Sequence, residues 1–168
     1  MRKRLVILIG AIFTLGILSQ VALAADKFAY VDLSRLFSEY NKTKDYDKVL
    51  TEKERVYGND RDKKVNDVKQ LQDKINLLSE KEKEARKPEL ETKIKNLQEF
   101  DRQQQTDLRK EQNDKMKEIL KDIEDAVKQY AEKEGYTMVF NDRVLVYQTK
   151  SLDITDKIIT ILNKGYKR

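Results

Sequence analysis

The chain has 168 residues, 39 % of them charged, and it contains no Cys, His or Trp. Without Cys or His it offers no disulfide framework, no thiolate or imidazole metal ligand and no Ser–His or Cys–His catalytic pair, so we predict a protein that is not an enzyme and carries no cofactor or metal. A single Pro and five Gly provide few turns, which favours one domain made of a few long elements.

Residues 1–24 have the three parts of a secretory signal peptide. A basic segment at Arg2–Arg4 precedes an uncharged apolar stretch over residues 5–18, and a small-x-small triplet ends at Ala24. We predict cleavage after Ala24 and secretion of the remaining chain. The alternative is an uncleaved membrane anchor, because residues 5–25 are nearly long enough to span a bilayer.

Removal of this leader brings the chain close to neutrality. The leader holds three of the 35 basic residues and none of the 30 acidic ones, so the net charge falls from +5 to +2. A chain this close to neutral does not fit strong attraction to nucleic acid. We therefore expect no nucleic-acid partner.

A short apolar segment follows the leader. Residues 27–33 alternate as a strand does, with Phe28 and Tyr30 on one face. Ala29 and Val31 lie on the other face. Because both faces are apolar, the segment is typical of a strand that is buried on both sides. A short helix that begins at a polar cap is expected to follow the strand.

The long charged middle of the chain spans residues 49–134, where apolar residues recur every three or four positions. This spacing predicts two long antiparallel helices, a coiled-coil-like arm whose tip lies near residues 79–88. Pro88 suits the first turn of a helix, so we expect the return helix to begin near it. Gly135 is placed to end that helix.

The predicted seam between these helices is apolar near the tip and the base but polar in the middle, where Asp60 and Lys64 should face Gln104. Gly58 lies beside this polar stretch, and Gly costs about 1 kcal/mol in a helix interior. We predict a hinge at Gly58 and a mobile arm. An ordinary solvated helix pair with polar register residues is the alternative.

Beyond the arm the hydrophobic period changes from helical to two. Residues 136–140 and 144–147 are predicted to form the two strands of a tight hairpin, and a short amphipathic helix follows them. Residues 25–48 and 135–168 would together make a small β-rich body of three short strands and two short helices. The prediction is an α+β fold with the helical hairpin projecting from this body.

A body of about 60 residues has a marginal core on its own, yet its predicted strands are apolar on both faces. A second copy of the chain is the simplest cover for the face that the short helices leave open, so we predict that the body oligomerises. The predicted oligomerisation core consists of Phe28, Tyr30, Val31, Val139, Phe140, Leu145 and Val146.

With its elements in this order, the chain resembles the Skp/OmpH family of periplasmic chaperones. The resemblance rests on the leader, the opening run Ala25–Asp32, the long charged hairpin and the closing apolar segments Met138–Phe140 and Val146–Tyr147. It implies a jellyfish-like homotrimer in which the strands join in a central body and the helical arms enclose a cavity. It also implies location in the periplasm and ATP-independent holding of unfolded outer-membrane proteins.

A holdase needs weak and adaptable contacts, and the candidates for contact with a client are Tyr57, Phe100 and Met116. Met116 also fits packing within the seam, whereas Tyr57 and Phe100 lie beside the seam and are expected to be exposed. The alternative function is a structural or adaptor coiled coil of the cell envelope, because paired helices alone suit a spacer equally well.

The tip has a basic cluster that is a candidate for contact with anionic lipid or lipopolysaccharide: Lys81, Lys83, Arg86 and Lys87. Residues 60–120 contain 16 basic and 15 acidic residues, so the arm is nearly neutral and such contact should be weak. Because the cluster is interleaved with Glu82 and Glu84, it also fits a solvated turn.

Overall fold

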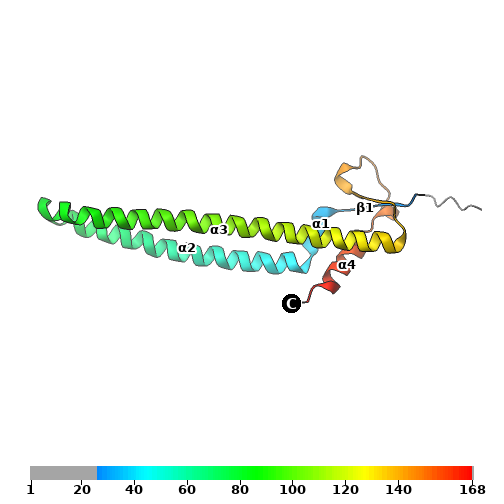
Figure 1. Ribbon diagram of the computed structural model, residues 1–168, viewed down its shortest axis with the longest axis horizontal. Coiled ribbons are helices and arrows are strands. Elements are labelled where there is room, and N and C mark those ends of the chain that lie inside the picture. Colours follow the sequence, from blue (N-terminus) through cyan, green and yellow to red (C-terminus); the bar gives the residue numbers. More distant parts are fainter. Residues whose placement is uncertain (1–25, 168) are drawn as a thin grey trace, which may run out of the picture.

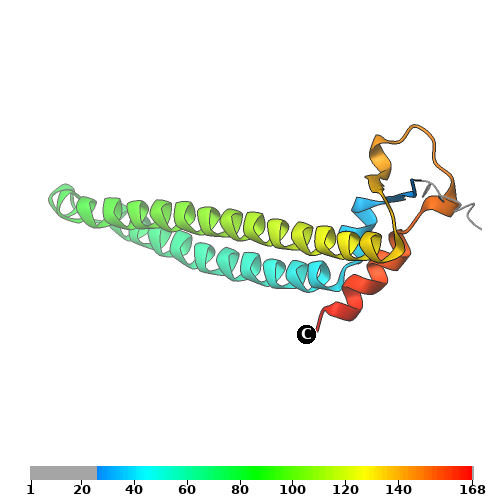
Figure 2. The same ribbon diagram turned by 45° about the vertical axis from the view of Figure 1, so that its right-hand side comes forward.

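The computed structural model describes residues 26–167, a long helical arm on a small body (Figure 1). The arm is a hairpin of α2 (Asn41–Asn76) and α3 (Glu80–Glu134), which lie side by side in both views (Figures 1 and 2). The body contains β1 (Phe28–Val31), α1 (Leu33–Glu39), β2 (Met138–Asn141), the 3-10 turns η1 (Asp142–Val144) and η2 (Lys150–Leu152), and α4 (Thr155–Gly165). The predicted helical hairpin is confirmed, but the molecule is mostly helical and its body is less rich in strands than expected.

The predicted signal peptide, with its cleavage after Ala24, lies outside the described residues. The described chain opens at Asp26 and enters β1 at Phe28. Between residues 26 and 167, none of the helices is both long enough and apolar enough to cross a membrane.

A capping box at Ser79 begins the return helix. The Glu82 carboxylate accepts hydrogen bonds from the Ser79 amide at 3.1 Å and from its hydroxyl at 2.5 Å. The expected start near Pro88 was therefore wrong, since α3 begins at Glu80 and continues through the proline. Pro88 lies on an exposed stretch of α3, where water can satisfy the carbonyl that loses its intrahelical partner.

The other helix boundaries follow ordinary capping rules. The Asp32 carboxylate accepts a hydrogen bond from the Arg35 amide at 2.9 Å and caps α1. Gly135 ends α3 as predicted, with a positive φ of 74° that a residue with a side chain rarely adopts. A one-residue break at Tyr40 separates α1 from α2, so the first arm helix begins at Asn41, earlier than expected.

The sheet has two strands that run parallel, and the register places Phe28 opposite Met138. The predicted hairpin between residues 136–140 and 144–147 was wrong. The Asn141 side chain accepts a hydrogen bond from the Arg143 amide at 3.2 Å and begins η1, which turns the chain out of the sheet. Residues 144–147 have no strand partner within the described chain, and the second edge of β2 stays unpaired there.

The core of the body is built around the root of α3. Ile119, Ile123 and Ala126 of α3 pack with apolar side chains from β1, α1 and α4. Ile119 and, on α4, Ile158 are almost completely buried. Because the same helix continues into the arm, the arm and the body share one hydrophobic core.

An ion network joins α2 to α3 where the arm leaves the body. The Lys42 ammonium lies 2.6 Å from the Asp122 carboxylate and 2.7 Å from that of Glu118, and the Tyr40 hydroxyl donates to Asp122 at 3.0 Å. Burial, together with the Asp122 hydrogen bond, raises the pKa of Tyr40 to about 12. Hydrogen bonds from Lys115 and Lys42 lower the pKa of Glu118 to about 2.

We predict that Glu118 stabilises the arm root at neutral pH but not in strong acid. Because its folded pKa of about 2 lies below the ordinary value of 4.5, its contribution is present above pH 4.5 and is lost as the pH falls through that window. Glu118→Gln should therefore lower the melting temperature near neutral pH, and the deficit should shrink towards zero near pH 2. Circular dichroism melts across this range measure the effect.

The exposed Glu132→Gln, near the end of α3, is the control for loss of one negative charge. A deficit of Glu118→Gln that stays constant with pH, or one that Glu132→Gln reproduces, would contradict the assignment.

Candidate functional site

The outer face of the sheet is apolar and uncovered in the described chain. The rings of Phe28 and Phe140 lie on it with their centroids 6.3 Å apart. A cavity of about 350 Å³ opens there, lined by Phe28, Ala29, Tyr30, Met138, Phe140, Leu145, Tyr147, Gln148 and Leu152. A monomer rarely leaves such a patch open to water, so this face is a candidate assembly surface.

The segment after β2 forms an apolar loop that stands away from the helices in both views (Figures 1 and 2). Val144 and Tyr147 are largely exposed, and Val146 is 106 % exposed. The Arg143 guanidinium donates to the Ser34 hydroxyl at 2.5 Å and holds the start of the loop against α1. The loop therefore adds a second apolar surface beside the uncovered face.

The structure divides the predicted oligomerisation core. Four of its members line the uncovered face: Phe28, Tyr30, Phe140 and Leu145. Val31 is buried in the chain's own core and Val139 packs against that core, because side chains alternate across a strand and these two point towards the helices. Those two residues are therefore not available to a second copy, whereas Val146 lies in the exposed loop.

Two aromatic rings bridge the helices in the middle of the arm. Tyr57 of α2 and Phe100 of α3 have their centroids 5.8 Å apart, and the Tyr57 hydroxyl donates to Asp101 at 3.1 Å. Asp101 also accepts from Arg61 at 3.2 Å. Both aromatic side chains are half-buried, so the expectation of exposure was wrong for this pair, which supplies part of the seam.

Met116 of α3 is more exposed than Tyr57 and Phe100, with an exposed fraction of 46 %. Glu111, Lys115 and Ile119 take the seam positions on either side of it. Packing of Met116 within the seam is therefore not observed, and its side chain is accessible along with that of Leu120, one turn further on.

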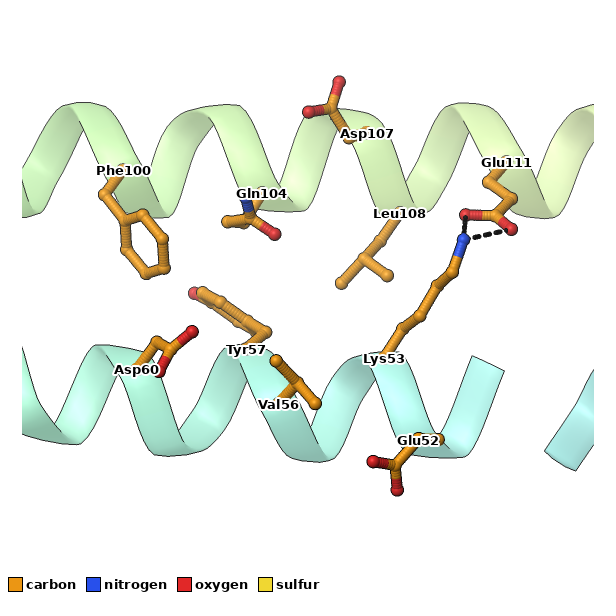
Figure 3. A pocket seen from close by; sticks show the side chains of 10 residues that line it. All are labelled: Glu52, Lys53, Val56, Tyr57, Asp60, Phe100, Gln104, Asp107, Leu108 and Glu111. Atoms are coloured by element: carbon orange, nitrogen blue, oxygen red, sulfur yellow. Dashed lines mark hydrogen bonds and ion pairs between the residues drawn. The ribbon is translucent and has the colours of Figure 1, made fainter. Parts of the chain in front are cut away.

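A groove of about 430 Å³ opens between α2 and α3 beside the aromatic pair (Figure 3). Tyr57 and Leu108 point into it from opposite helices, and Gln104 extends from α3 towards α2. An ion pair of 2.6 Å between Lys53 and Glu111 closes one end. The polar middle of the predicted seam is therefore a gap in the packing of the two helices.

The helices meet in a different register from the expected one. The Lys64 ammonium lies 5.0 Å from the centre of the Phe100 ring, nearer the tip than Gln104, which it was expected to face. Nearer still to the tip, Val68 and Leu97 line one shallow cavity. The turn lies at residues 77–79 and not at Pro88, which shifts the partners of α2 along α3.

The basic residues of the tip are mostly paired within α3. Three of them form ion pairs with glutamates three positions away: Lys83 with Glu80, Arg86 with Glu89, and Lys87 with Glu84. Lys81 is exposed in the first turn of the helix. These pairs leave little net positive charge at the tip, although exposed pairs of this kind are weak.

Sequence reasoning missed several residues of these two surfaces. Met138 lies on the uncovered face beside Phe140, and their spacing of two along a strand was an available signal. Val56 and Leu108 line the groove from opposite helices. No signal in the sequence placed them opposite each other, because that placement depends on where the hairpin turns.

An uncovered apolar face at the base of a long arm, and a mixed groove along that arm, define a class of helical-hairpin proteins with a small body at one end. The chain belongs to the OmpH-like family, since residues 27–162 match the family model described as outer membrane protein (OmpH-like). The predicted family membership is confirmed.

Two relatives illustrate the match. The chaperone protein Skp of Pectobacterium atrosepticum is 28 % identical over 150 residues, which cover 81 % of this chain and 85 % of the relative. A crystal structure of an OmpH-like protein from Caulobacter crescentus matches with a TM-score of 0.77 at 11 % identity and covers 84 % of this chain and 86 % of that one. At that identity the structural match shows the shared fold.

The predicted hinge at Gly58 can be tested by substitution. Because α2 is helical throughout that region, the position can accept a residue that favours the helix more than Gly does. A Cβ added at Gly58 would meet no heavy atom within 4 Å, so Gly58→Ala should stabilise the helix by about 0.5–1 kcal/mol. We expect slower amide hydrogen exchange in residues 54–62 and a higher melting temperature. Gly165→Ala, which also has free space but lies at the end of α4, should leave exchange in the arm unchanged. Equal exchange in wild type and Gly58→Ala would contradict a hinge.

Proposed function

We propose that the protein is a periplasmic, ATP-independent holdase chaperone that encloses unfolded outer-membrane proteins between the mobile arms of a homotrimer. The observation that carries the proposal is the uncovered apolar face at the base of a long arm. Membership of the OmpH-like family and similarity to a chaperone support the role. A structural spacer of the envelope is the alternative, but a spacer has no need of this face.

Assembly through the body would gather several arms around one axis. The outer faces of the sheets would bury one another's aromatic side chains, and the loop at residues 144–147 would gain a strand partner from the free edge of a neighbouring β2. This arrangement accounts for apolar side chains at Val144, Val146 and Tyr147, which no part of the described chain covers.

Client contact would fall on the arms, where apolar groups are scattered among balanced charges. Met116 and Leu120 are exposed on one face of α3, and Tyr57 and Phe100 are accessible from the groove between the helices. Such contacts are individually weak and not selective for one sequence, as a holding function requires. Contact of the tip with anionic lipid or lipopolysaccharide would be weak, because the basic residues there are largely paired with glutamates.

Val146→Asp is predicted to disrupt the oligomer. Val146 is fully exposed in the single chain, so the substitution costs the monomer little, whereas a charge buried at an apolar interface is strongly unfavourable. Light scattering coupled to size exclusion should show the mass of a trimer for wild type and a smaller mass for the variant. Leu77→Asp, at the exposed turn of the arm, is the matched control and should keep the wild-type mass. A Val146→Asp variant that remains trimeric would refute this placement of the interface.

Replacement of residues 70–97 by a short loop should leave a folded oligomer that captures clients poorly. The deletion removes the outer part of both arm helices but none of the body core. We expect helical content and oligomer mass consistent with a shortened trimer, and a severalfold loss in suppression of aggregation when a denatured porin is diluted from urea. If the full-length protein at stoichiometric amounts does not suppress aggregation, the holdase proposal fails and the spacer becomes the better explanation.

A further inference from the structure

We propose that Asn163 of α4 is a positioning residue that holds the bend between α1 and α2, and that without it these two helices join into one continuous helix. The bend lies at the point where the arm leaves the body. The joint then has two helical arrangements, and α4 selects the bent one. This property belongs to the single chain, so its test needs no client.

The sequence around the bend gives no reason for a helix to stop. Residues 33–48 contain neither Gly nor Pro, the residues at which helices usually bend or end. Tyr40, which separates the two helices, has an extended backbone with a φ of −69° and a ψ of 125°, and its side chain makes no capping hydrogen bond to α2. The cause of the break therefore lies outside this segment.

The side-chain amide of Asn163 is inserted into the break. Its Oδ1 accepts a hydrogen bond from the Asn41 amide at 2.7 Å, and its Nδ2 donates to the Glu39 carbonyl at 3.2 Å. In a continuous helix these two backbone groups would bond instead to the Phe37 carbonyl and the Thr43 amide. One side chain thus takes the place of two bonds of the helical ladder, and such an insertion is a known cause of a sharp bend.

The length of α4 brings Asn163 to the bend. At the first residue of α4, the Thr155 hydroxyl accepts a hydrogen bond from the Asp32 amide at 2.9 Å, directly before α1. Asn163 lies eight residues beyond Thr155, and Tyr40 lies eight residues beyond Asp32. Both segments rise about 12 Å at 1.5 Å per residue, so α4 runs beside α1 in the same direction and contacts the chain before and after it.

Tyr40 is held from outside the two helices that it separates. Its side chain is 4 % exposed, and its ring packs edge-on against Tyr166, at the end of α4, with the centroids 5.8 Å apart. Its hydroxyl donates to Asp122 of α3 at 3.0 Å. These contacts come from α4 and α3, so they stabilise the bent arrangement together with Asn163.

One buried group favours the straight arrangement. The Thr43 side chain is 2 % exposed, and its hydroxyl has no hydrogen-bond partner among the described residues. A Thr hydroxyl within a helix commonly donates to the carbonyl four residues before it. That carbonyl belongs to Glu39, which lies across the bend and accepts from Asn163. Straightening would therefore supply the partner that the bent arrangement lacks.

The bend allows α2 to follow α3 while α1 stays in the body. Leu36 of α1 is completely buried in the core, and α3 continues from the arm into the same core without a break. If α1 and α2 became one helix, either α2 would leave the root of α3 or α1 would leave the core. In both cases the outer ends of α1 and α2 move apart.

The test measures the distance between spin labels on α1 and α2 by pulsed electron paramagnetic resonance. The chain has no Cys, so Ser34→Cys and Thr51→Cys, both at exposed positions, provide the only label sites in every protein compared. Labelled protein is diluted with unlabelled protein, so that distances within one chain dominate. These positions are 17 residues apart, which a straight helix extends to about 25 Å along its axis, and the bend shortens this distance.

Asn163→Ala removes both hydrogen bonds at the break. We expect a second, longer distance population on the order of 10 % of the molecules, absent from the wild-type background. Thr155→Val is the matched control, because it removes one buried hydrogen bond at the other end of α4, and it should keep the single wild-type distance. Circular dichroism verifies that every variant is folded at the temperature of labelling.

Asn41→Pro combined with Asn163→Ala should restore the single distance. Pro is excluded from the interior of a continuous helix, because it lacks the N–H and clashes with the carbonyl four residues before it. It suits the first position of a helix, which Asn41 occupies in α2. Tyr40 already has the extended backbone that the residue before Pro prefers. The proline therefore blocks straightening in the absence of Asn163.

An unchanged single distance in Asn163→Ala overturns the inference. An equal longer population in Thr155→Val also overturns it, because a general loosening of α4 would then account for the change. A longer population that persists in the double variant shows that the second arrangement is not a continuous helix, and it overturns the inference as well. If Asn163→Ala does not fold, the double variant decides: the wild-type distance supports the role of Asn163, and failure to fold refutes it.

Discussion

The burial of the α3 root is the constraint on which the rest of the structure depends. Ile119, Ile123 and Ala126 lie in the same core as β1, α1 and α4, so the longest helix of the molecule is also a central element of its body. A small body of this kind has too little apolar surface to fold around a separate core. The arm is therefore fixed at its base, and the Lys42 network with Glu118 and Asp122 holds α2 to the same point.

Away from this root the arm is held much less tightly. Its middle has one aromatic contact, between Tyr57 and Phe100, and next to it a groove where a well-packed helix pair would bury apolar side chains. Contacts of this density give low local stability. An arm of this kind would be able to change shape around a client, which suits the proposed holding of many unfolded chains.

The body differs from the arm in that it leaves apolar surface uncovered. Two parallel strands have one face against the helices and the other open to water, with Phe28 and Phe140 on the open side. The loop that follows β2 leaves Val146 wholly exposed. In the proposed homotrimer these two surfaces would be buried together, and the same assembly that completes the body would gather the arms. The proposed function therefore connects an incomplete core at one end with client capture at the other.

Much of this plan was determined by the sequence alone. The long hairpin follows from the helical periodicity over residues 49–134, and its end follows from Gly135, which adopts a left-handed conformation. The two faces of β1 follow from the alternation of Phe28 and Tyr30 with Ala29 and Val31. These are local properties, because side-chain period and glycine backbone freedom depend on neighbours in the chain.

Only the tertiary structure decided the long-range pairings. The strand partner of β2 is β1, more than a hundred residues away, and not the adjacent residues 144–147. The return helix begins at the capping box of Ser79 and not near Pro88, and this start sets the register of the whole arm. In that register Tyr57 contacts Phe100, and a groove lies beside them between α2 and α3. Period and composition constrain which face of an element is buried, but the partner that buries it is chosen by the packing of the complete chain.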